Sequence, residues 1–424
     1  QLNKPRISKT LNTSNCKHRV ENVSIQIKSW PVSEKFNAAY FCLQILQKIE
    51  PLKYIHQETT IQCTQFMMKI YILFFNLLSI VNGLSLEALG FDNNYFVSSV
   101  AIYGTRTFLA LPRSVCFNQK KSNPTLVEIT KAGDRYFYTP NIFDASRQKL
   151  LGYQQWGDCN SLQDVISIDM QQQMRTKLWI LDKGSKKCLP KVTSLTLIYN
   201  SFSENIELNG IAGRDLNTIK VDPGEYQDGA RAYIGSAGEN EMIALSLNTL
   251  KWWKIHLIEP INPVQVIKVD YLAKSKTDSK LYITSKDGNE VYFLNTHDIK
   301  KLDHKKKGIQ KVNVTYVGDK LGASTGIETD YKAGLNYYMV SDYVILRWII
   351  GSPMKAEYHN VLAQSYEKLP YVSELFTGPQ RGLWAVVNSG SPDMCNLTDL
   401  PTVQKRFVKI LKFNAIYKDL EIDE

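Results

Sequence analysis

The chain has 424 residues, of which 44% are hydrophobic and 22% charged, and this balance excludes a disordered or low-complexity protein. The formal net charge of +10 is unevenly spread: residues 1–83 contain ten basic and four acidic residues, and the remainder contains 41 and 37. A surplus this weak over the main part of the chain excludes a phosphate-binding surface, so we predict no nucleic-acid partner.

The first 83 residues are typical of a leader that precedes the folded domain. Residues 1–66 lack methionine, whereas Met67-Met68-Lys69 is followed by the apolar run 70–81 and by Asn82-Gly83. One positive charge, a short apolar region and a small residue at its end are typical of a secretory signal peptide. The run is shorter than the about 17–25 residues of a membrane-spanning helix; a buried core helix is the alternative.

This pattern divides the chain into three parts. We expect residues 1–66 to be an untranslated, artefactual or disordered extension and 67–83 to be the signal peptide. Residues 84–424 are then a single secreted, extracellular domain with no membrane attachment after signal removal.

Beyond residue 84, short β-branched and aromatic runs alternate with turn residues, and no long helical periodicity persists. Asp287-Gly288 between two of the runs is a hairpin signal. The predicted strands are 97–103, 107–111, 165–169, 177–181, 192–199, 219–221, 231–234, 242–247, 252–257, 264–269, 281–284, 290–295, 312–317, 325–329, 337–340, 344–349, 383–387 and 407–413.

Six of these runs share a central aromatic residue flanked by apolar residues. The aromatic residues recur every 46 to 71 positions, at Phe108, Trp179, Tyr233, Tyr282, Tyr338 and Trp384. Periods of this size are typical of propellers and other repeat arrays. Closure of the array into a ring would also protect strand edges that carry little charge.

Four cysteines fall in the predicted domain, at Cys116, Cys159, Cys188 and Cys395. An even number in a secreted chain indicates disulfides, with three possible pairings. Because Cys159 and Cys188 bracket one short strand, a local bridge between them is plausible. Cys116 and Cys395 would then pair by elimination, or remain free thiols. Asn313-Val314-Thr315 and Asn396-Leu397-Thr398 are candidate glycosylation sites.

Several sequence blocks resemble the yellow/major royal jelly protein family of insects. They are 159–166, 177–184 and 188–191, together with Phe108-Leu109-Ala110-Leu111-Pro112-Arg113, Pro124-Thr125-Leu126 and Arg381-Gly382-Leu383-Trp384. The resemblance spans about residues 95–413. It implies an all-β fold, a six-bladed β-propeller, in agreement with the six aromatic runs.

Catalytic and metal-binding motifs are not evident in the predicted domain. It has no His-Glu-x-x-His, Walker, nucleophile-elbow or dinucleotide-binding sequence. His297 and His304 with the neighbouring Asp298 and Asp303 are more simply a polar loop than a metal site. We therefore predict no metal and no cofactor.

The mouth of the central channel is the expected functional site of a propeller. The channel-facing ends of the innermost strands are predicted to carry Gln163, Asn217, Gln265, Thr325 and Ser373, with Asn388 nearby. In amine-binding members of the family, a hydroxyl residue and an asparagine of the last blade contact the ligand, and Ser373 and Asn388 match them. Ser389-Gly390 stands where those members carry an aromatic residue. Ordered water is the alternative occupant.

Three functions remain open. The preferred one is a non-catalytic binder of a small aromatic or biogenic-amine ligand. A melanin-pathway enzyme of the dopachrome-converting type is the second, and it would need a positioned acid or base. A ligand-free storage or structural protein of the extracellular space is the third. The sequence makes no prediction of oligomeric state.

Overall fold

The chain divides into two units, Gln1–Val81 and Asn82–Glu424. The computed structural model describes residues 84–85, 95–115, 124–132, 135–139, 154–172, 176–224, 229–236, 240–302, 310–378, 381–393 and 406–411. The predicted extension and signal peptide lie outside these residues. So do Cys116, Cys395 and Asn396.

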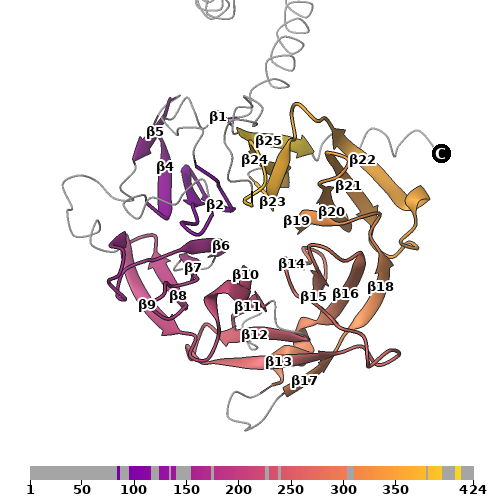
Figure 1. The fold of residues 1–424 in the computed structure, drawn as a ribbon, viewed down its shortest axis with the longest axis horizontal. Coiled ribbons are helices and arrows are strands. Elements are labelled where there is room, and N and C mark those ends of the chain that lie inside the picture. The colour runs from indigo at the N-terminus through magenta and orange to yellow at the C-terminus, as the bar shows by residue number, and fades with distance from the viewer. Residues whose placement is uncertain are drawn as a thin grey trace, which may run out of the picture. The chain divides into compact units, whose positions relative to one another are not determined.

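Within the second unit the described strands form six sheets, which surround a common centre as in a β-propeller (Figure 1). Neighbouring strands are antiparallel, except for the parallel pair β13 and β17.

In chain order, the first three sheets are β2 (Ser99–Tyr103), β3 (Arg106–Ala110), β4 (Leu126–Ala132) and β5 (Arg135–Thr139); β6 (Val165–Gln171), β7 (Lys177–Asp182), β8 (Lys191–Thr196) and β9 (Ser201–Glu207); and β10 (Leu216–Asp222), β11 (Arg231–Ser236), β12 (Glu241–Ser246), β13 (Trp252–Ile258) and β17 (Gln310–Asn313). The other three are β14 (Tyr271–Lys274), β15 (Lys280–Thr284), β16 (Glu290–Asn295) and β18 (Thr315–Asp319); β19 (Ser324–Thr329), β20 (Gly334–Met339), β21 (Val344–Ile349) and β22 (His359–Gln364); and β23 (Tyr371–Thr377), β24 (Leu383–Asn388), β25 (Arg406–Leu411) and β1 (Leu84–Ser85).

Helix is scarce in the described residues. The helices described in full are α4 (Thr296–Lys300) and the 3-10 turns η4 (Gly213–Asp215) and η5 (Ala356–Tyr358). None of the described helices is long and apolar enough to cross a membrane.

The six recurrent aromatic residues all lie in the strand next to the innermost one of their sheet, namely β3, β7, β11, β15, β20 and β24. These strands are covered on both faces by neighbouring sheets, which explains their nearly continuous apolar composition. Phe108 and Trp179, for example, are fully buried. The sequence repeat therefore marks the strand that forms the middle of each sheet.

The strand prediction was wrong in two situations. It missed strands with polar sequences, and it assigned a strand to an apolar run that forms none. β9 and β22 are outermost strands whose side chains are largely exposed or half-buried, so they lack an apolar run. The predicted strand 264–269 forms no ladder; Val264 is 86% exposed, and the innermost strand begins only at Tyr271. Pro263 just before the run has no N–H to donate. The predicted strand 312–317 is divided between β17 and β18.

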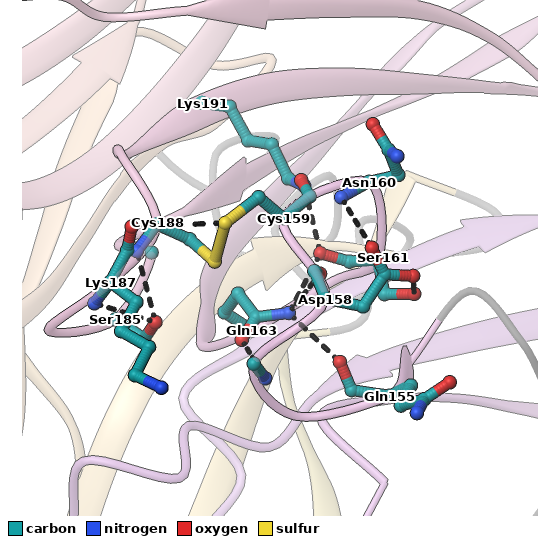
Figure 2. The surroundings of a disulfide bond; sticks show 12 residues. Gln155, Asp158, Cys159, Asn160, Ser161, Gln163, Ser185, Lys187, Cys188 and Lys191 are labelled. Carbon is teal, nitrogen blue, oxygen red and sulfur yellow. Dashed lines mark hydrogen bonds between the residues drawn. A yellow bond between two sulfur atoms is a disulfide. The ribbon is translucent and has the colours of Figure 1, made fainter.

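The disulfide between Cys159 and Cys188 is present, with a Cα–Cα distance of 5.1 Å (Figure 2). It joins the loop before β6 to the loop before β8. The Lys191 ammonium donates to the carbonyl oxygens of Cys159 at 2.6 Å and Ser161 at 2.8 Å. The local bridge predicted from the spacing is thus confirmed.

Candidate functional site

A cavity of about 530 Å³ lies where the innermost strands meet. Every sheet contributes to its wall, with Ser99 from β2, Ser167 from β6, Lys220 from β10, Leu272 from β14, Ile327 from β19 and Glu374 from β23. Its mouth is formed by loops that follow the second strand of several sheets and carry Ser114, Lys183, Lys286 and Asp393.

Irregular pairing of the innermost strands explains which side chains line the wall. The registers of β6, β10, β19 and β23 with their neighbours are interrupted, and the unpaired residues are Ile166, Asn217, Thr218, Gly326, Ile327 and Ser373. All six line the cavity. A β-bulge re-aims side chains at a strand end. Gly326 has φ +57° and approaches the backbone of Leu375, so a side chain there would be strained.

Aromatic rings form part of the wall near the mouth. Phe96, Tyr271 and Tyr371 line the cavity, and the rings of Phe96 and Tyr371 are 5.9 Å apart, centroid to centroid. Burial raises the pKa of both tyrosine hydroxyls, which therefore stay neutral. Neutral aromatic faces of this kind favour a flat or cationic ligand.

Charged groups near the mouth are held in fixed positions. Asp270 accepts from the Asn217 side-chain amide at 2.9 Å and from the backbone N–H of Lys286 at 2.8 Å. The Lys286 ammonium lies 3.3 Å from Asp393. These two hydrogen bonds fix the position of the Asp270 carboxyl group in the cavity wall.

Lys220 and Glu374 form a second charged layer, three residues farther along their strands than Asn217 and Tyr371. We call this pair the floor. Lys220 Nζ lies 3.4 Å from Glu374 Oε1 and 3.6 Å from Glu328 Oε2. Glu374 Oε2 accepts from the backbone N–H of Val100 at 2.6 Å.

Burial and the neighbouring charges together set the protonation of the floor. Burial raises the pKa of Glu374 to about 7, and Lys220 and the Val100 N–H act in the opposite direction. Burial would lower the pKa of Lys220, but the adjacent carboxylates outweigh it and hold this pKa above its ordinary value. Lys220 is therefore charged throughout the physiological range, while Glu374 titrates within it.

Two of the six predicted ligand residues, Asn217 and Ser373, line the cavity. The Ser373 hydroxyl donates to the carbonyl oxygen of Val97 at 2.7 Å. Asn388 is buried beside it and is not part of the lining: its side-chain amide donates to Val97 O and Ser373 Oγ, and its Oδ1 accepts from Val97 N. These polar atoms join the first sheet to the last.

The other three predicted residues lie away from the lining. Gln163 is fully buried in the loop beside the disulfide, where its amide donates to the carbonyl oxygens of Gln155 and Asp158 (Figure 2). Thr325 donates to the carbonyl oxygen of Val372 at 2.6 Å. Gln265 lies in the segment before β14. Gln163 and Thr325 thus hydrogen-bond to backbone groups of the protein. The sequence pattern does not distinguish a polar residue with this role from one that binds a ligand.

The sequence prediction missed the floor and the aromatic wall. Lys220 and Glu374 are 154 residues apart, and no motif links them. Among the described residues no group of three His, Cys, Asp or Glu side chains is placed to hold a metal ion. His297 lies in α4, and His304 is outside the described residues.

No family model and no curated protein matches the sequence. Solved structures with a similar backbone include virginiamycin B lyase from Staphylococcus aureus, at 11% identity over 73% of this chain and 82% of that one, with a TM-score of 0.43. An auxiliary nutrient binding protein from Bacteroides thetaiotaomicron is 9% identical over 68% and 66%, with a TM-score of 0.44. Similarity this distant indicates nothing about function.

Proposed function

We propose that the six sheets are the blades of one closed ring of the yellow/major royal jelly protein type. In support, five apolar clusters each join two sheets that are neighbours in chain order. A sixth cluster packs Val100 and Leu109 of the first sheet against Phe376 and Val386 of the last. The hydrogen bonds of Asn388 to Val97 cross the same junction. Pairing of β1 with β25 adds an amino-terminal strand to the last sheet.

Within this ring, the cavity is proposed to bind a small aromatic or biogenic-amine ligand, and the protein to be a secreted, non-catalytic binder. The observation that carries the proposal is the convergence of aromatic rings with the carboxylates of Asp270 and Glu374 in one cavity. Its volume falls within the range of small-molecule sites, roughly 300–1,000 Å³. An aromatic face beside a carboxylate favours an organic cation over a neutral ligand.

A dopachrome-converting enzyme is the alternative, and Glu374 is the observation in its favour. A carboxyl group with a pKa of about 7 in a cavity wall is suited to proton transfer near neutral pH. Binding is preferred because the cavity also presents the rings of Tyr271 and Tyr371 and the carboxylate of Asp270, which suit recognition of a ligand and which proton transfer does not require.

Titration calorimetry with serotonin, dopamine and histamine, run beside a dopachrome-decay assay, tests these functions. Saturable heat without turnover supports the binding protein. Turnover that is lost in Glu374→Gln supports the enzyme. Absence of both would contradict both functions and leave a storage or structural role.

A further inference from the structure

The floor joins two strands from different parts of the ring. Lys220 belongs to β10 and Glu374 to β23, and these strands lie on opposite sides of the centre in Figure 1. The ion pair therefore crosses the cavity. A ligand that enters from the mouth meets both charges at the end of its path.

The charges around the floor do not balance. Three carboxylates, Glu374, Glu328 and Asp169, are grouped with two ammonium groups, Lys220 and Lys276. Lys276 pairs with Glu328 at 2.9 Å, which leaves Lys220 to be shared between Glu328 and Glu374. One negative charge is left uncompensated in a largely desolvated place, where it attracts either a proton or a cation.

We propose that Glu374 is the group of the cavity at which a cationic ligand and a proton compete, so that acidification releases the ligand. The inference rests on the proposed binding function and adds its regulation. Glu374 is the carboxylate of this cluster that lines the cavity, whereas Glu328 and Asp169 are not among the lining residues. The contacts of its Oε1 are both long, at 3.4 Å from Lys220 Nζ and 3.3 Å from Ser99 Oγ, so a closer cationic donor can compete with them.

The surroundings of Glu374 set the pH at which the competition occurs. A pKa of about 7 makes the carboxyl about one-tenth ionised at pH 6 and mostly ionised at pH 8. The groups that face it are Lys220 from β10, Glu328 from β19, Asp169 from β6, and the Val100 N–H and Ser99 hydroxyl from β2.

Calorimetry with serotonin between pH 5.5 and 8.5 tests the competition, because an alkylammonium group stays charged over this range. We expect affinity to rise about tenfold per pH unit below 7 and to level off above it. Glu374→Gln should bind more weakly at pH 8 and show no such rise. In Lys220→Met the midpoint should move to higher pH, because the charge that stabilises the carboxylate is gone. An affinity independent of pH in the wild type, or an unchanged rise in Glu374→Gln, would overturn the proposal.

Urea unfolding without ligand separates this inference from the proposed function. The raised pKa of Glu374 means that the folded state binds the proton more tightly than the unfolded chain. The contribution of this carboxyl group to stability is therefore fully present in acid and is lost as pH rises through about 7. Glu374→Gln should abolish that loss, whereas Glu241→Gln, which breaks the outlying pair with Lys254, should retain it. If serotonin does not bind at any pH, the proposed function fails and the competition fails with it; a loss of stability specific to Glu374 would still identify the titrating group. Equal pH dependence in all three proteins would overturn that assignment too.

Discussion

Asn388 was predicted from the sequence to contact a ligand, but in the structure its buried side-chain amide hydrogen-bonds to the backbone of Val97. Its two polar atoms bind both backbone groups of Val97, a residue 291 positions earlier in the chain. Because these bonds are buried, their loss would leave the Val97 N–H without its acceptor, and the Val97 carbonyl oxygen would keep only the Ser373 hydroxyl.

Asn388→Ala should therefore lower the free energy of unfolding by about 2–3 kcal/mol, as measured by urea denaturation. Asn360→Ala, at an exposed position on the outermost strand β22, is the matched control and should change little. Equal effects of the two substitutions would show that Asn388 does not hold the sheets together.

Tyr271 is the residue whose role in binding is simplest to isolate. Its ring lines the cavity near the mouth, and Asp270 precedes it. An aromatic face contributes about 0.5–2 kcal/mol to the binding of a cation. Tyr271→Leu should thus weaken serotonin binding by about 2- to 30-fold at pH 8, with unchanged thermal stability within a few degrees. Tyr199→Leu, at an exposed position, should bind as the wild type does; a similar loss in both variants would argue against the cavity.

At the scale of the element, the strands that could be predicted from the sequence are mainly those whose side chains are buried. β7 and β16 were found from the sequence because covered strands need β-branched and aromatic residues. β23 was missed because it carries Ser373 and Glu374 toward the cavity, which removes its apolar pattern. The bulges that turn these side chains inward depend on the partner strand, so a single strand's sequence does not encode them.

The disulfide gives a second test at this scale. It fixes the loop that contacts the first sheet, where Arg113 donates to the carbonyl oxygens of Leu162 at 3.2 Å and Gln163 at 2.8 Å. For a loop closed over a sequence separation of 29, replacing both Cys159 and Cys188 by serine should cost about 3.6 kcal/mol of stability. Thermal unfolding with and without reductant measures it, since the reductant should affect the wild type and leave the double variant unchanged. An unaltered melting temperature in the double variant would contradict this role.

At the scale of the whole molecule, the cavity exists only because distant strands come together. The repeat of six aromatic strands predicted a propeller-type array, and the structure shows the propeller arrangement. Which polar residues reach the centre depends on pairing between Lys220 and Glu374, and on the close packing of the first and last sheets. Such contacts have no local signature, so only two of six predicted site residues line the cavity.

A crystal structure of the protein grown with serotonin at pH 8 tests the central claim most directly. The account predicts the ligand in the cavity, with its ring against Tyr271 or Tyr371 and its ammonium within hydrogen-bonding distance of Asp270 or Glu374. Serotonin bound elsewhere on the protein, with only water in the cavity, would contradict it.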